Sequence, residues 1–149
     1  MPTHASWMAG TARLFGAGIF LATVSLPTPV AAQRAAARQE IGKTSVGTPT
    51  PVFLEARSVS REGTIVTATI RVALVPPLKH PKGELKSSRT IGMYNCAQKT
   101  VATKESWYYL DDAGKREGMH RVVKIPGFGP VGKGSVADVA LTHLCAKTP

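Results

Sequence analysis

The chain has 149 residues, only two of them cysteine, and a formal net charge of +10 at pH 7. This length fits one domain and is too short for two beside a leader segment. The basic balance disfavours cationic partners and favours polyanions such as anionic lipid, sulfated glycan or nucleic acid, although a basic surface also occurs without any such ligand.

Residues 1–32 have the three parts of a secretory signal peptide. Arg13 and the amino terminus supply positive charge, residues 14–26 are an uncharged apolar run, and small residues end the segment at Ala32. The apolar run spans roughly 20 Å as a helix, short of the ~30 Å hydrocarbon core, so a transmembrane anchor is the weaker alternative. We predict cleavage between Ala32 and Gln33. No cysteine follows the run, so no lipid anchor is expected.

The mature chain keeps 18 of the 19 basic residues and all nine acidic residues, which gives a formal charge of +9. Export places it in the periplasm or outside the cell, where nucleic acid is an improbable partner. Residues 33–51 contain Pro49 and Pro51 and no apolar periodicity, so they predict a flexible segment or a weak edge strand. The folded domain is expected over residues 52–149.

The clearest strand signal is the stretch TIVTATIRVAL at residues 64–74. Its apolar side chains recur at every second position and share one face: Val66, Ala68, Ile70, Val72 and Leu74. Alternation with period two predicts a half-buried antiparallel strand. Pro76 and Pro77 are expected to end it.

Residues 78–90, LKHPKGELKSSRT, are the densest cationic part of the chain. They carry four basic side chains against one acid, which are Lys79, Lys82, Lys86 and Arg89 against Glu84. We interpret the segment as a loop and as the best local candidate for docking an anionic partner. The alternative is an ordinary solvated loop.

Further strands are expected on both sides of the turn at DDAGK (111–115), with Gly114 at the position of positive φ. Residues 91–110 predict one bent strand or two, and REGMHRVVKI (116–125) predicts a returning strand. By parity, Trp107 and Tyr109 share a face and are expected in the core. An exposed aromatic binding platform is the alternative.

The tail predicts a short helix. Ser135 is a candidate N-cap, and Asp138 places an acid near the positive end of the helix. Apolar residues and His143 then follow at helical spacing up to Cys145. The predicted fold class is α+β, with an antiparallel sheet of about five to six strands and a C-terminal helix on one face.

Cys96 and Cys145 lie 49 positions apart and match no metal or redox spacing. In an oxidising compartment such a pair usually forms a disulfide, and closing this loop stabilises a fold by roughly 4 kcal/mol in the chain-entropy model. We predict that the bond holds the helix against the sheet. A free catalytic thiol is the weaker alternative.

No motif nominates a catalytic or metal site. His80, His120 and His143 show no H-x-x-x-H pairing, and the chain has neither C-x-x-C nor G-x-S-x-G. The stretch GFGPVGKGS (127–135) lacks the spacing of a phosphate loop. We therefore predict a protein that is not an enzyme and needs neither metal nor cofactor.

Four stretches occur in an order that resembles a known family: VFLEARSVSREGTIVTATIRV, SSRTIGMYNC, YLDDAGK and GSVADVALTHLC. They are similar to the surface-adhesin protein E-like family over about residues 50–146. The resemblance implies a small exported bacterial envelope domain in which Cys96 and Cys145 occupy the two cysteine positions. It also implies binding of a host extracellular-matrix protein and a homodimer as a further alternative.

Together these features predict a non-catalytic, adhesin-like envelope protein. It would bind an anionic glycan, an anionic lipid surface or a host protein through its basic residues. Two alternatives remain: a periplasmic protein that binds a small ligand such as haem in an apolar pocket, and an envelope assembly factor acting through a sheet edge.

Overall fold

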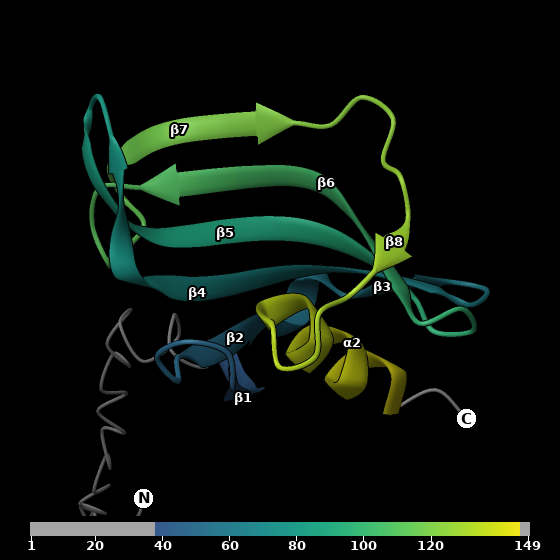
Figure 1. The fold of residues 1–149 in the computed structure, drawn as a ribbon. Helices are drawn as coiled ribbons and strands as arrows, with labels where there is room; N and C mark the ends of the chain where they lie inside the picture. The colour runs from purple at the N-terminus through teal and green to yellow at the C-terminus, as the bar shows by residue number, and fades with distance from the viewer. Residues whose placement is uncertain (1–37, 147–149) are drawn as a thin grey trace, which may run out of the picture.

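The computed structural model describes residues 38–146. Within this range the chain forms one antiparallel sheet with a single α-helix, α2 (Val136–Ala146), on one face (Figure 1). The predicted leader and its cleavage site between Ala32 and Gln33 lie outside the described residues. The α+β class is confirmed, with eight strands instead of five to six.

The sheet runs in the order β1-β2-β4-β5-β6-β7, with β3 paired to β4 and β8 paired to β6. The strands are β1 (Arg38–Lys43), β2 (Pro51–Glu55), β3 (Ser60–Glu62), β4 (Ile65–His80), β5 (Gly83–Asn95), β6 (Thr100–Tyr109), β7 (Glu117–Val122) and β8 (Gly129–Pro130). A 3-10 turn, Ala56–Ser58, follows β2. β1 lies at one edge of the sheet and pairs with β2.

The core lies between α2 and one end of the sheet. On β4, Val66, Ala68 and Ile70 are buried, as their alternation predicts. They pack with residues of β2, β5 and α2, namely Val52, Leu54, Tyr94, Ala140, Leu141 and Leu144. Val72 and Leu74 continue the same face but are only half-buried. The apolar face of β4 therefore extends past the region that the helix covers.

The helix begins and ends as its sequence predicts. The Ser135 hydroxyl accepts a hydrogen bond from the Asp138 amide at 3.3 Å, and the Asp138 carboxylate accepts one from the Gly134 amide at 2.8 Å. The first bond satisfies a first-turn amide that has no partner within the helix, and the second ties the residue before the N-cap to the first turn. At the other end, a disulfide joins Cys145 to Cys96, with the two Cα atoms 5.4 Å apart. Cys96 directly follows β5, so the bond fixes the end of the helix to the end of a central strand.

The prediction of a loop over residues 78–90 is wrong. β4 continues through Pro76 and Pro77 to His80, and β5 begins at Gly83, so the segment is a two-stranded arm. The register of the β4–β5 ladder is irregular between Ala73 and Leu78, and it resumes at Leu78. Because the prolines fall in this interruption, their missing N–H groups remove no regular ladder bond. Figure 1 shows the arm rising toward the end of the sheet that holds β7.

Candidate binding surfaces

The arm formed by residues 78–86 carries three exposed lysines. Lys79 lies on β4, Lys82 in the turn and Lys86 on β5. Lys79 faces Glu84 across the ladder. A shallow cleft of about 280 Å³ lies beside the arm and brings Lys82 and Lys86 together with Arg116 from the strand-to-strand connection before β7.

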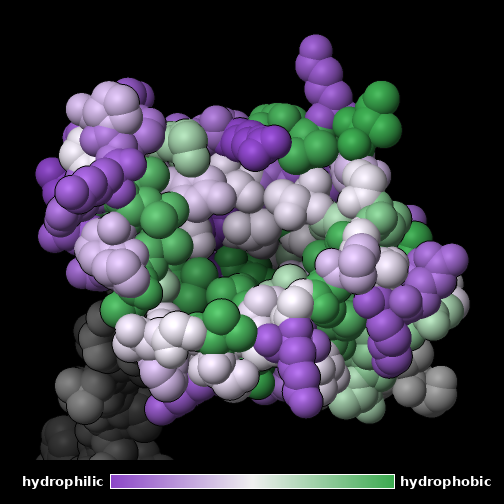
Figure 2. All heavy atoms as spheres, in the orientation of Figure 1, coloured by the Kyte–Doolittle hydropathy of each residue, from purple (hydrophilic) through white to green (hydrophobic). Residues whose placement is uncertain are grey.

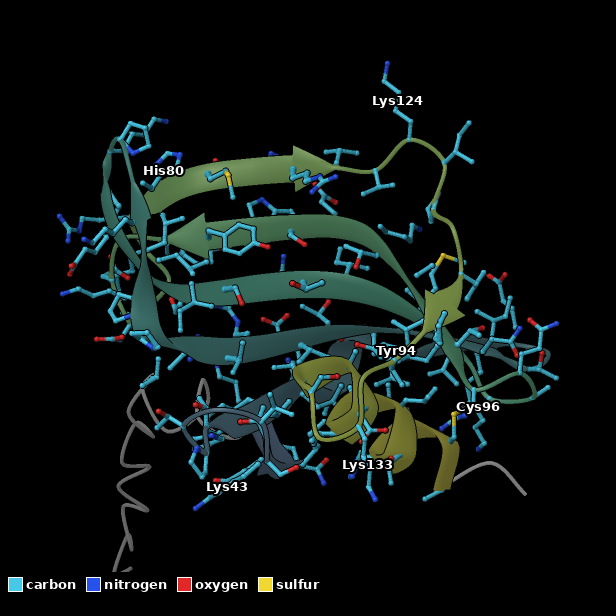
Figure 3. The ribbon with its side chains drawn as sticks, in the orientation of Figure 1. Lys43, His80, Tyr94, Cys96, Lys124 and Lys133 are labelled. Carbon is cyan, nitrogen blue, oxygen red and sulfur yellow. A yellow bond between two sulfur atoms is a disulfide. The ribbon has the colours of Figure 1, made fainter. Side chains whose placement is uncertain are left out.

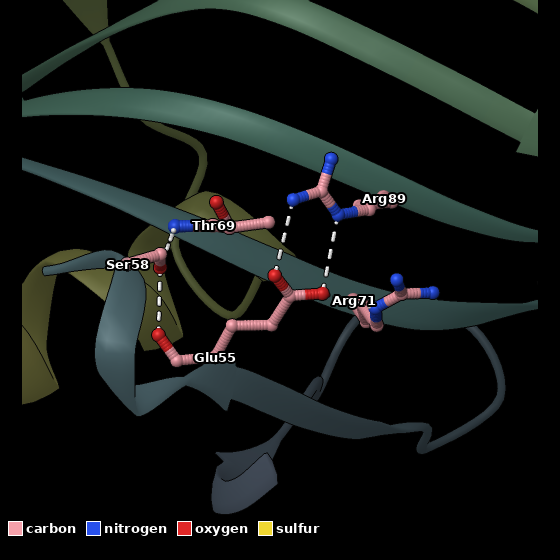
Figure 4. Close-up of polar contacts among 5 residues, drawn as sticks. All are labelled: Glu55, Ser58, Thr69, Arg71 and Arg89. Atoms are coloured by element: carbon pink, nitrogen blue, oxygen red, sulfur yellow. Dashed lines mark hydrogen bonds and ion pairs between the residues drawn. The ribbon is translucent and has the colours of Figure 1, made fainter. Parts of the chain in front are cut away.

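Arg89 occupies a different environment from the three lysines. It lies in the middle of β5, and its guanidinium donates two hydrogen bonds of 3.1 Å to the two carboxylate oxygens of Glu55 (Figure 4). The Arg71 guanidinium also donates to Glu55. The Arg89 side chain is 25% exposed. Glu55 thus neutralises part of the charge that Arg89 could offer to an external anion.

The two arginines belong to one row of side chains across five strands. One residue of each strand faces one residue of the next strand. The row consists of Phe53 on β2, Arg71 on β4, Arg89 on β5, Trp107 on β6 and His120 on β7. We call this set the cross-strand row. It lies on the sheet face away from α2, because side chains alternate along a strand and Val52 and Leu54 point into the core.

Direct contacts link the members of the cross-strand row. The Arg89 guanidinium lies 4.7 Å from the centroid of the Trp107 ring, and the His120 ring stacks on Trp107 with centroids 5.0 Å apart. The Glu105 carboxylate lies 2.6 Å from Nε2 of His120. Stacking and ion pairs of this kind stabilise neighbouring strands. The row therefore ties together the sheet face that has no helix cover.

Glu55 is the electrostatic centre of this face. Burial of its carboxyl raises the pKa, but the hydrogen bonds from Arg89 and Arg71 outweigh burial, and the net effect lowers the pKa below its ordinary value. The same hydrogen bonds raise the pKa of Arg89. A carboxylate between two guanidinium groups remains ionised, so this cluster acts as a structural cross-link.

The opposite face of the sheet is hollowed beside α2. A cavity of about 340 Å³ lies over β4, β5 and β6, and it is open to solvent (Figure 2). Its lining is mainly apolar, with hydroxyl groups from β5 and β6. Gly92 and Tyr94 form part of the floor. A Cβ atom at Gly92 would lie 2.7 Å from the Tyr94 hydroxyl oxygen, so the absence of a side chain there lets the Tyr94 ring lie along the strand.

The three histidines within the described residues lie on three separate elements. His80 is at the tip of the arm (Figure 3), His120 is in the cross-strand row and His143 is on α2. Within residues 38–146 no group of three or more His, Cys, Asp or Glu side chains is placed to hold a metal ion. His120 has Glu105 as its hydrogen-bond partner and Trp107 as its stacking partner.

The aromatic cluster divides between the two faces. Tyr109 is buried at 9% exposure, but it lies on the sheet face away from α2 and outside the core cluster, so the prediction that Trp107 and Tyr109 lie in the core is wrong in its location. Trp107 is half-buried in the cross-strand row, and Tyr108 lines the hollow on the helix side. The Glu55 network is not apparent in the sequence, because its members come from β2, β4 and β5. Its signal is the coincidence of charged residues at facing positions, and this emerges only when the register is known.

Comparison with known proteins gives one family. The family model described as surface-adhesin protein E matches residues 40–146. Solved structures of Haemophilus influenzae protein E are similar in fold. Its crystal form II has 19% identity and a TM-score of 0.48, and covers 64% of this chain and 80% of that chain. A second structure has 17% identity and a TM-score of 0.45, and covers 73% and 93% of the two chains. No curated protein matches significantly.

Among the described residues, no helix has both the length and the apolar character that crossing a bilayer requires.

Proposed function

This chain belongs to the surface-adhesin protein E family, and from that premise we propose that its basic arm binds an anionic partner at the cell envelope. The observation that carries the proposal is the placement of Lys79, Lys82 and Lys86 on a projecting two-stranded arm. All three are exposed, and no carboxylate forms an ion pair with them within the described residues. Their charge is therefore available to a polyanion such as a sulfated glycan or an anionic lipid surface.

The arm is better suited to this role than the two arginines at the centre of the same sheet. Arg71 and Arg89 are engaged by Glu55, whereas the arm lysines are exposed. Arg116, beside the arm, is 69% exposed and pairs with Asp111 at 3.4 Å. An exposed pair of this kind is weak and leaves Arg116 able to contribute to the same surface.

The experiment replaces the three arm lysines together with serine. Binding to heparin or to vesicles containing anionic lipid should weaken roughly 100-fold, because each lysine near an anionic surface contributes about 1 kcal/mol. The dependence of binding on salt concentration should flatten as well. Retention on a heparin column and vesicle co-sedimentation, each measured at several salt concentrations, check the prediction.

A matched variant controls for net charge. Lys104, Lys124 and Lys133 are exposed and lie on β6, in the β7–β8 connection and before α2. Replacing these three with serine removes the same charge from other surfaces and should weaken binding much less. Equal losses in the two variants would mean that net charge, and not the arm, determines binding, and the proposal would then fail.

We propose, in addition, that the protein reaches the envelope through cleavage of residues 1–32 between Ala32 and Gln33. Of residues 33–51, Arg38–Lys43 form the edge strand β1 of the domain. The mass of the protein isolated from the envelope tests the cleavage position. The family assignment supports a non-catalytic, adhesin-like role.

A further inference from the structure

The hollow on the helix side is part of a longer groove. The cavity of about 340 Å³ shares Val101, Thr103 and Tyr108 with a second of about 400 Å³, which reaches β7. The first cavity also shares lining residues, among them Leu78 and Val136, with a third cavity of about 310 Å³ beside the base of the arm. Shared lining residues mean that the three cavities adjoin. The groove therefore runs from the base of the arm, past the start of α2, to β7.

The chemical character of the groove changes across the sheet. Four residues face one another across neighbouring strands: Ile70 on β4, Thr90 on β5, Ser106 on β6 and Arg121 on β7. The row passes from an apolar side chain through two hydroxyls to a cation. With strands about 4.8 Å apart, this gradient extends over roughly 14 Å. At the other end, beside the arm, Val46, Val75 and Leu78 are exposed apolar side chains.

Arg121 is the one charged residue among the described residues that line the three cavities. Its side chain has no hydrogen-bond or ion-pair partner within residues 38–146. An uncompensated guanidinium at the end of an apolar groove is complementary to a ligand with one anionic end and an apolar body.

The floor of the groove distinguishes an acyl chain from a peptide. It is the face of a sheet whose backbone groups bond within the β4–β5 and β5–β6 ladders. The Thr90 and Ser106 hydroxyls lie 3.3 Å apart and bond to each other. A bound peptide would bring amide groups that find few partners on this floor, and burying them unpaired is unfavourable. An alkyl chain has no such requirement.

We propose that the groove binds the single alkyl chain of a free fatty acid, with its carboxylate on Arg121 and its chain directed toward α2 and the base of the arm. One guanidinium matches one carboxylate, which favours a fatty acid over a lipid with several anionic groups. The site is separate from the arm lysines and does not depend on the adhesin-like role.

The experiment titrates the naturally processed protein with hexanoate, octanoate and decanoate below their micelle concentrations, using calorimetry. Each added methylene should tighten binding roughly two- to fourfold, because part of the chain surface leaves water. Amide chemical shifts measured by NMR should change at Thr103 and Arg121. Absence of decanoate binding, or affinity independent of chain length, would overturn the proposal.

Two variants locate the site. Arg121→Gln should weaken decanoate binding roughly fivefold and leave decanol binding unchanged. Arg57→Gln removes an equal charge from an exposed position on the 3-10 turn and should change neither. Thr103→Phe, at an exposed position lining two of the cavities, should block both ligands.

Other outcomes discriminate between occupants. If decylammonium binds as tightly as decanoate, the carboxylate assignment to Arg121 is wrong. Haem and a test peptide are used as competitors. If either of them binds in the groove and decanoate does not displace it, then another ligand class occupies the groove and the proposal is overturned. If Thr103→Phe does not fold, the NMR shifts of the unchanged protein still decide the location. Replacing the arm lysines should leave decanoate binding unaltered.

Discussion

At the scale of single residues, Glu55 joins the two arginines on the sheet face away from the helix. Its carboxylate accepts hydrogen bonds from Arg71 and Arg89. Arg89 in turn lies over Trp107, which stacks on His120. Loss of the carboxylate would leave two partly buried guanidinium groups beside one another without a counter-charge, and this is costlier than loss of a single surface ion pair.

We expect Glu55→Gln to lower the free energy of unfolding by about 2 kcal/mol, the typical value for hydrogen bonds to a charged group. The change should also alter the response to acid. Because the pKa of Glu55 is lowered in the folded state, its contribution is fully present above the unfolded value near 4.3 and is lost as the pH falls through the folded value. Urea denaturation between about pH 2 and 7 measures both effects.

The control for this variant is Glu62→Gln, at an exposed position on β3. It should leave the midpoint of denaturation near that of the unchanged protein. The pKa of Asp111 is also lowered, chiefly because its carboxylate accepts a hydrogen bond from the backbone amide of Lys115. Some loss of stability in acid should therefore persist in Glu55→Gln. Equal acid sensitivity of Glu55→Gln and the unchanged protein would contradict our account of Glu55.

At the scale of elements, the disulfide is a covalent cross-link between the end of α2 and the end of β5. Replacing Cys96 and Cys145 with serine opens a loop defined by a sequence separation of 49. We expect the free energy of unfolding to fall by roughly 4 kcal/mol, since the cross-link restricts the unfolded chain. Thermal and urea denaturation of the double variant measure the loss. A loss below about 1 kcal/mol would mean that helix packing alone fixes the element.

The sequence is informative where structure is determined locally. The alternation of Val66, Ala68 and Ile70 identifies the central strand, and Ser135 with Asp138 marks the start of the helix. Both signals are set by residues within one turn or one strand. The disulfide also follows from the sequence, because only two cysteines are present and the predicted export favours their oxidation.

The arm and the groove are not predictable in the same way. Pro76 and Pro77 argue against a continuing strand, and only the irregular register between Ala73 and Leu78 makes room for them. The groove depends on which strands lie side by side, and its terminal cation, Arg121, is 51 positions from Ile70 in the chain. Local patterns contain no information about pairings of this kind, so neither the Glu55 network nor the groove is visible before the register is known.

At the scale of the whole molecule, the sheet is much wider than α2. α2 covers the β1–β2–β4 side together with the end of β5, while β6 and β7 extend beyond it (Figure 1). The uncovered region on the helix side is the groove, and on the other side the cross-strand row provides the packing. Binding surfaces can therefore occupy the wide part of the sheet without disturbing the core beneath the helix.

This division predicts an uneven distribution of local stability. Backbone amides of β4 near Val66, Ala68 and Ile70 should exchange with solvent most slowly, because they lie between paired strands and beneath α2. Amides of β7 should exchange faster, since β7 pairs with β6 on one side and with no other strand of residues 38–146. Hydrogen exchange followed by mass spectrometry resolves these segments.

The same measurement distinguishes the two sources of stability. In Glu55→Gln, exchange should accelerate in β2 and in β5 near Arg89, because the interrupted contacts join those strands. In the variant without the disulfide, the increase should be greatest in α2 and near Cys96. If both variants accelerate exchange uniformly throughout the sheet, then the domain opens as a single cooperative unit, and the helix-covered part has no stability independent of the groove and the arm.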